Sequence, residues 1–85
     1  MAALHDELVR ALRASGMSLY EARIFLGLLQ HGPQNGNELS RTAKVPSSKV
    51  YAVLGKLSDE GIVHSFRRDG ATRFAAIAPD ELGAR

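Results

Sequence analysis

Seven cationic side chains between residues 41 and 73 are the part of this sequence best suited to chemistry. They stand against three acidic residues in the same segment, a net charge of +4, whereas the whole chain carries only +2. Positive charge concentrated in this way suits a surface that binds a polyanion, although chance clustering on a solvated surface is the competing interpretation. The seven residues are Arg41, Lys44, Lys49, Lys56, Arg67, Arg68 and Arg73.

Patterns of residues that support catalysis or metal binding are absent from the sequence. The chain has no cysteine, and His5, His31 and His64 are too far apart in the sequence to suggest a metal site. Neither a phosphate-binding glycine loop nor a nucleophile elbow occurs. A single small core also leaves little room for a substrate pocket. We therefore expect a protein that is not an enzyme and that needs no cofactor.

The composition predicts one small globular domain. Hydrophobic residues make up 45% of the 85 residues and charged residues 24%, as in ordinary folded proteins. The longest apolar stretch, residues 24–29, is too short to cross a bilayer. The N-terminus lacks the basic start and the apolar run of a signal peptide. We expect a cytoplasmic protein with no membrane partner.

Four helices are expected within residues 1–61. A leucine at every fourth position predicts the first helix, over residues 1–15. The second and third helices begin with capping boxes, in which a polar side chain and a glutamate three positions later each satisfy a free backbone N–H. These pairs are Ser18 with Glu21 and Asn35 with Glu38.

The fourth helix is expected over residues 47–60, with Ser47 or Ser48 as its cap. Val45–Pro46 ends the third helix, because the residue before a proline disfavours helical geometry. Only three or four residues then separate the two helices, which is the short connection of a helix-turn-helix.

The sequence changes from helical to extended after residue 61. Residues 62–66 and 72–77 are β-prone, and the segment 67–71 between them contains Asp69–Gly70, a strong hairpin signal. The expected fold is therefore mainly α (α+β): a winged helix-turn-helix of four helices followed by a two-stranded β-hairpin wing. The single domain over 1–85 is expected to divide into an N-terminal helix over 1–15, a helical core over 18–61, the wing over 62–78 and the start of a truncated C-terminal helix over 79–85.

In a helix-turn-helix the second helix of the pair enters the major groove of DNA with its N-terminal residues first. Here the face opposite the apolar stripe carries small residues, which let the helix backbone approach base edges. A serine-capped N-terminus would also offer free N–H groups to a phosphate. Asp59 and Glu60 would repel phosphates, so contacts are expected only in the first two or three turns. The expected contacts on this helix are Ser47, Ser48, Lys49, Tyr51, Ala52 and Lys56. We expect Tyr51 to be half-buried.

The wing and the third helix supply the remaining candidates for DNA binding. Arginine suits phosphate through its planar fork and also enters narrow minor grooves. We expect the wing, over residues 67–73, to contact the backbone or the minor groove through Arg67, Arg68 and Arg73. Weaker candidates for backbone contact on the third helix are Asn37, Arg41 and Lys44.

Three strings of residues resemble the N-terminal domain of the TrmB family of sugar-responsive transcriptional regulators. They are Leu19-Tyr20-Glu21-Ala22-Arg23, Val45-Pro46-Ser47-Ser48-Lys49-Val50-Tyr51 and Glu60-Gly61-Ile62-Val63. The resemblance implies a DNA-binding module that dimerises and precedes a coiled-coil linker and an effector-binding domain, the latter absent from this chain. Ser47 stands where the family often has a basic residue, and Ala52 and Gly55 where it often has charged ones.

The expected function is sequence-specific binding of double-stranded DNA as a transcriptional regulator, by a homodimer. The alternative is a winged-helix protein–protein interaction module in a multisubunit assembly, which the apolar first helix and the small-residue face would also suit. Candidate dimer contacts are the helix that begins at Pro79 and the stripe of Leu4, Leu8 and Leu12, although such a stripe equally fits a helix that packs on the core.

Overall fold

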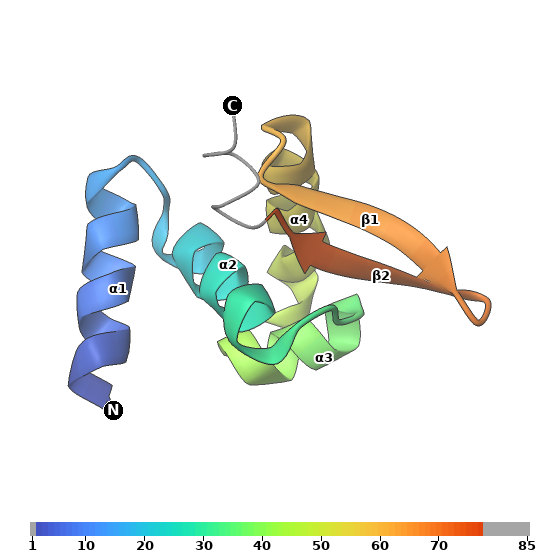
Figure 1. Ribbon diagram of the computed structural model, residues 1–85, viewed down its shortest axis with the longest axis horizontal. Helices are drawn as coiled ribbons and strands as arrows, with labels where there is room; N and C mark the ends of the chain where they lie inside the picture. Colours follow the sequence, from blue (N-terminus) through green and yellow to red (C-terminus); the bar gives the residue numbers. More distant parts are fainter. Residues whose placement is uncertain (1, 78–85) are drawn as a thin grey trace.

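The computed structural model describes residues 2–77 of the chain. Within that range four helices precede a two-stranded antiparallel sheet, so the predicted winged helix-turn-helix fold is confirmed (Figure 1). The helix predicted from Pro79 lies outside the described residues. The elements are α1 (Ala2–Ala14), α2 (Leu19–His31), α3 (Gly36–Ala43), α4 (Ser47–Asp59), β1 (Val63–Arg68) and β2 (Ala71–Ala76).

Both predicted capping boxes are present and begin α2 and α3. The Glu21 amide donates to Ser18 Oγ over 3.1 Å, and the Ser18 amide donates to Glu21 Oε1 over 2.8 Å. The equivalent bonds between Asn35 and Glu38 measure 2.8 and 2.9 Å. Each pair satisfies two backbone donors that have no partner within the helix, which defines where each helix begins.

The start of α4 differs from the prediction, because its N-cap is Pro46 and no side chain bonds to its first turn. The predicted serine cap is therefore wrong. Lys44 takes the left-handed conformation, with φ 56°, and ends α3. Pro46 then has φ −54°, as its ring requires, and stands at the cap position itself. Ser47 and Ser48 are consequently inside the first turn of the helix, where a side chain cannot act as the cap.

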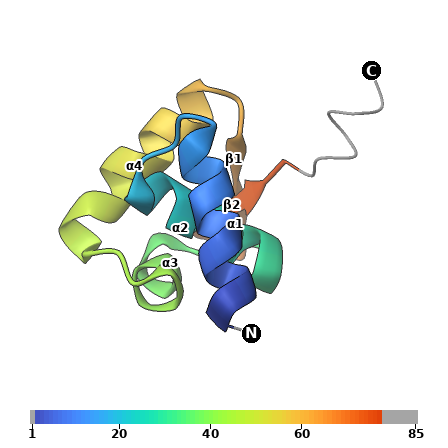
Figure 2. The same ribbon diagram turned by 90° about the vertical axis from the view of Figure 1, so that its left-hand side faces the viewer.

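Helix α2 forms the centre of the molecule, with α1 on one side and α3 and α4 on the other (Figures 1 and 2). Its buried side chains join those of α3, α4 and both strands in one core. Each fully buried aliphatic side chain contributes roughly 1.5–3 kcal/mol. This core therefore fixes the orientation of α4 relative to α2. Its members are Ile24, Leu28, Leu39, Ala43, Val45, Val50, Leu54, Leu57, Val63 and Phe74.

The strands of the wing reach further toward its tip than predicted, and the turn between them is tighter. Strand β1 pairs with β2 from Val63↔Ala76 to Arg68↔Ala71, which leaves a turn of two residues. Asp69 and Gly70 have φ values of 54° and 78°, the positive values that a type I′ hairpin turn requires. The predicted loop over 67–71 is therefore too long, and both arginines at its start belong to β1.

Two backbone hydrogen bonds attach the base of the wing to the loop before α3. The Phe74 amide donates to the Gln34 carbonyl over 2.8 Å, and the Gln34 amide donates to the Phe74 carbonyl over 3.1 Å. Gln34 is itself buried, and its side-chain amide donates to the Gly27 carbonyl over 3.2 Å. The wing is thus held to the helical core at a point next to the start of α3.

Candidate nucleic-acid interface

The exposed side of α4 is made of small residues, as the sequence analysis expected. Val50, Leu54 and Leu57 are buried on one side of the helix, whereas Ala52 and Gly55 are exposed on the other. Ser47, Ser48 and Lys49 in the first turn are exposed as well. No side chain of the described residues covers the backbone on this side of Gly55, where an added Cβ would meet no atom within 4 Å.

Tyr51 is 60% exposed, so the prediction that it is half-buried is wrong. The position is at the edge of the buried stripe, where the ring lies over neighbouring elements instead of entering the core. The ring contacts Phe74 of β2 edge-on, with centroids 6.3 Å apart. It also lies against Gly36, the first residue of α3. The exposed sides of α3, α4 and the wing therefore adjoin at Tyr51.

The three predicted arginines of the wing have different surroundings. Arg67 donates to Thr72 Oγ1 over 3.1 Å and to the Gly70 carbonyl over 2.7 Å. These bonds stabilise the turn of the hairpin, and because both acceptors are neutral, the guanidinium group keeps its charge. Arg68 is exposed and forms no ion pair within residues 2–77. Arg73 lies 3.4 Å from Glu38 Oε1 and links β2 to α3. Arg68 is consequently the wing residue most available to a phosphate.

Lys56 is engaged by a carboxylate on α2. Its Nζ lies 2.9 Å from Glu21 Oε2, and the Glu21 side chain is only 5% exposed. A hydrogen bond from the Ser18 backbone, and then the one from Lys56, hold the pKa of Glu21 below its usual value. The same carboxylate raises the pKa of Lys56. Lys56 therefore fastens α4 to α2, and it is a poorer candidate for phosphate contact than Lys49, which forms no ion pair in the described part of the chain.

The candidates on α3 are exposed but lie at different places along the helix. Asn37 directly follows Gly36 and is therefore close to Tyr51. Lys44 caps the opposite end, where its carbonyl accepts a hydrogen bond of 3.3 Å from Arg23. Arg41 lies in the last turn. The structure thus brings Asn37 to the surface near Tyr51, and places Lys44 in the short connection just before the first turn of α4.

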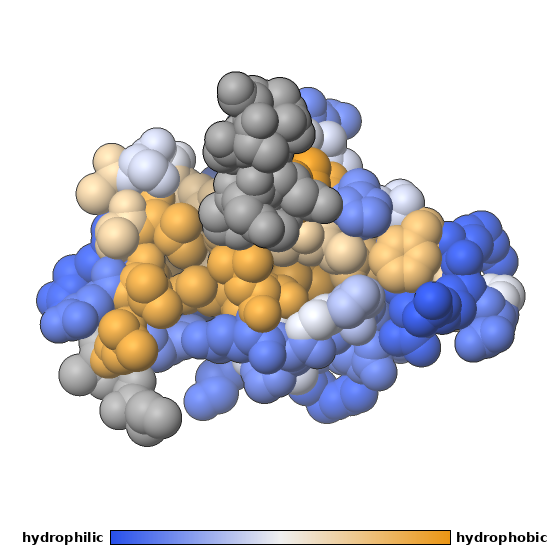
Figure 3. Space-filling view, in the orientation of Figure 1, coloured by the Kyte–Doolittle hydropathy of each residue, from blue (hydrophilic) through white to orange (hydrophobic). Residues whose placement is uncertain are grey.

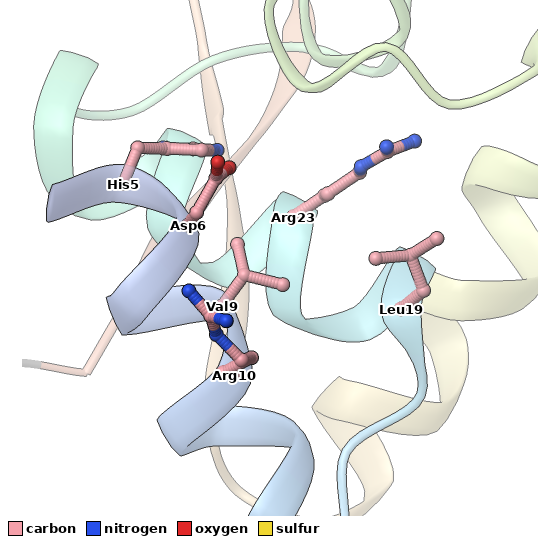
Figure 4. A pocket seen from close by; sticks show the side chains of 6 residues that line it. All are labelled: His5, Asp6, Val9, Arg10, Leu19 and Arg23. Carbon is pink, nitrogen blue, oxygen red and sulfur yellow. The ribbon is translucent and has the colours of Figure 1, made fainter. Parts of the chain in front are cut away.

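A groove between α1 and α2 forms a hollow elsewhere on the surface (Figure 4). It carries both signs of charge, and the Arg23 side chain points away from α1. No group of three or more potential metal ligands occurs among residues 2–77, and no helix in that range is long and apolar enough to cross a membrane. The groove thus differs from the first turns of α4, where Lys49 is the charged residue. Its lining residues are His5, Asp6, Val9, Arg10, Leu19 and Arg23.

Sequence reasoning missed the residues that hold the predicted side chains in place. It assigned Glu21 and Glu38 to helix caps only, although each also pairs with a cation from a distant element. It assigned no role to Gly36 or Phe74, which contact Tyr51. A glycine directly after a helix cap was the one local sign available, since the other contacts join residues far apart in the sequence.

Comparisons with known proteins give a consistent result. The family model described as sugar-specific transcriptional regulator TrmB matches residues 12–80. The chain is 30% identical over 60 residues to the HTH-type sugar sensing transcriptional regulator TrmBL1 of Pyrococcus furiosus, a match that covers 71% of this chain and 18% of the relative. It superposes with a TM-score of 0.82 and 25% identity on TrmBL2, described as an archaeal chromatin protein with a novel mode of DNA binding, covering 94% of this chain and 31% of that one.

The chain thus spans less than a third of the length of either of these two proteins. The match to the family model nevertheless runs from the end of α1 past the end of β2 and includes both helices of the helix-turn-helix. On this evidence, the chain belongs to the TrmB family.

Proposed function

We propose that this chain binds double-stranded DNA in a sequence-specific manner as the reader module of a transcriptional regulator. Helix α4 enters the major groove with its first turns, and the wing contacts the backbone or the minor groove. The task is binding rather than catalysis, and it belongs in the cytoplasm, where a regulator of this kind meets DNA. The names of TrmBL1 and TrmBL2, which refer to transcriptional regulation and DNA binding, support this assignment.

The continuous surface at Tyr51 is the observation that carries the proposal. Contacts of Tyr51 with Gly36 and Phe74 place the small-residue side of α4 next to the start of α3 and the base of the wing. Lys49 and Arg68 lie exposed on the two parts of this surface that would reach DNA. Small side chains beside cations suit close approach to base edges and attraction to phosphates.

We further propose that the module acts as a homodimer. The face that carries α1 and α2 in Figure 1 is largely apolar (Figure 3). Leu4 and Leu8 of α1 are 58% and 38% exposed, whereas Leu12 is half-buried. A second copy would remove these leucines from water. Replacing Leu4 and Leu8 together by glutamate should yield a monomer by analytical ultracentrifugation, and a wild-type chain that is already monomeric would contradict the proposal.

Selection of bound duplexes from a random pool tests DNA recognition directly. A regulator should enrich one sequence, and a dimer should enrich it as two half-sites with fixed spacing. Substituting Lys49 or Arg68 by alanine should weaken binding of the selected duplex and reduce its salt dependence. Recovery of unrelated sequences without enrichment would refute sequence-specific binding.

The alternative is a winged helix that binds another protein within a multisubunit assembly. The apolar face of α1 and α2 favours it, because protein interfaces often centre on such patches. A gel shift with random duplex at low salt, run beside a pull-down from lysate, separates the two functions. Absence of DNA retention together with a stoichiometric protein partner would favour the alternative.

A further inference from the structure

Tyr51 lies in a notch formed by α3 and β2. Its ring stands edge-on to Phe74, with the ring planes at 66°, an arrangement that aromatic pairs favour. The ring also lies directly against Gly36. A Cβ built on Gly36 would lie 2.9 Å from Tyr51 Cε1 and closer still to Cζ and to the hydroxyl oxygen. Only glycine at position 36 leaves space for the ring in this position.

The notch is rigid because backbone hydrogen bonds hold both of its sides. Phe74 exchanges two such bonds with Gln34, and Gly36 follows two residues later in the capped first turn of α3. Gly36 is buried, and its φ angle is not positive. The backbone conformation therefore does not require glycine, and helix propensity favours alanine at such a position. The close approach of Tyr51 is the feature that explains glycine here.

The exposed part of Tyr51 faces away from the core at the junction of α3, α4 and the wing. The Tyr51 side chain is largely exposed, with 60% of the residue accessible to solvent, and its hydroxyl group forms no hydrogen bond within residues 2–77. Tyrosine hydroxyls are among the donors that proteins direct at phosphate oxygens of DNA. A ring held on two sides loses little further rotational freedom when its hydroxyl binds, which favours affinity.

We propose that Gly36 is a positioning residue: it makes the space that holds Tyr51 with its hydroxyl directed at a backbone phosphate of duplex DNA. This role rests on the proposed function. It adds that the start of α3 determines the position of a contact on α4.

Duplex affinity is measured for Gly36→Ala, Tyr51→Phe and the double variant. Each single change should weaken binding about tenfold, the loss expected for one hydrogen bond to a charged oxygen. The double variant should be no weaker than Gly36→Ala alone, because a displaced ring no longer presents its hydroxyl. The matched control is Gly27→Ala, a helical glycine on α2 whose added Cβ would meet only ordinary contacts of 3.7–3.8 Å. It should leave affinity unchanged.

A measurement without DNA tests the notch separately. The chain has two tyrosines and no tryptophan, so Tyr51 is the only tyrosine in the Tyr20→Phe background. Its near-ultraviolet circular dichroism band should weaken when Gly36→Ala is added, while the far-ultraviolet spectrum stays that of a folded chain. An unchanged band would overturn the positioning role of Gly36, whatever the affinity.

The two measurements separate the possible failures. A weakened band with unchanged duplex affinity in Gly36→Ala would overturn the phosphate contact. Should Gly36→Ala fail to fold, full affinity in Tyr51→Phe would overturn the same contact, because that variant keeps the ring. A wild-type chain that binds no duplex at low salt would refute the proposed function, and the circular dichroism result would still decide whether Gly36 holds the ring.

Discussion

Lys49 and Lys56 lie seven residues apart on α4, close to two full turns, yet the structure predicts that they respond differently to substitution. Lys49 is exposed and forms no ion pair within the described residues. Lys56 lies 2.9 Å from the nearly buried carboxylate of Glu21. We expect Lys49→Gln to impair DNA binding and to leave stability intact, and Lys56→Gln to do the reverse.

The size of the effect on binding follows from the release of counterions. Each phosphate contact contributes about 0.9 to the slope of log affinity against log salt concentration. Losing the contact of Lys49 should therefore reduce that slope by about 0.9. Between 50 and 200 mM salt, the affinity of the variant should fall about 3.5-fold less than that of the wild type. Lys56→Gln should leave the slope unchanged, because its ammonium group is held by Glu21.

The effect on stability has the opposite pattern. Lys56→Gln leaves the Glu21 carboxylate without its cation, and the melting temperature should fall by a few degrees. The fall is small because Lys56 is 60% exposed and water screens the pair. Lys49→Gln should melt like the wild type. The double variant Glu21→Gln/Lys56→Gln should recover part of the loss, since glutamine preserves the cap of α2 and removes the unpaired charge.

Fluorescence anisotropy titrations of a labelled duplex at several salt concentrations, together with thermal melts, give both quantities. If Lys56→Gln flattened the salt dependence as much as Lys49→Gln, the pair with Glu21 would not keep Lys56 from DNA. If neither variant changed the slope, the assignment of α4 as the DNA-binding helix would be wrong.

Three further predictions follow from the same contacts. Glu38→Gln keeps the cap of α3 and releases Arg73 from its ion pair. In anisotropy titrations, duplex affinity should rise and the slope of log affinity against log salt concentration should steepen by about 0.9. An unchanged slope would show that Arg73 makes no phosphate contact. The pKa of Glu21 is lowered from 4.5, so the stabilisation that its carboxylate provides is present above that pH and is lost as the pH falls through the lower pKa of the folded state. In thermal melts from pH 7 downward, the difference in melting temperature between wild type and Glu21→Gln should shrink below about pH 4.5. A difference independent of pH would contradict this. Gly70→Ala places a side chain at φ 78° and should cost about 1–2 kcal/mol in urea unfolding. Gly55→Ala, at an open helical position, should instead stabilise the protein by up to about 1 kcal/mol. Effects of the same sign would argue against the type I′ turn.

The order of the elements could be predicted from the sequence because each element is specified locally. The capping boxes of α2 and α3 join residues three positions apart, and Asp69–Gly70 defines the turn of the wing on its own. The cap of α4 was mispredicted for a local reason as well. Serine and proline compete for the same position, and the fixed φ of Pro46 decides the outcome.

The candidate site was less predictable, because its side chains are positioned by contacts between distant segments. The hydrogen bond from Arg73 to Glu38 joins residues 35 positions apart, and no spacing rule for helices or strands relates them. The notch for Tyr51 likewise combines Gly36 with Phe74. Periodicity shows which side of α4 is exposed, but not which exposed cations are already paired.

This pairing changes what the cluster of seven cations means for binding. Lys56 and Arg73 face carboxylates, whereas Arg67 bonds only neutral acceptors and Lys44 lies just before the first turn of α4. Long-range attraction to phosphate therefore falls mainly to Arg41, Lys44, Lys49, Arg67 and Arg68, fewer charges than the sequence suggests. Affinity for random duplex should then be modest, and discrimination between sequences must come from close fit. The small-residue side of α4 and the fixed ring of Tyr51 provide that fit, so substitutions that change shape should affect specificity more than those that change charge.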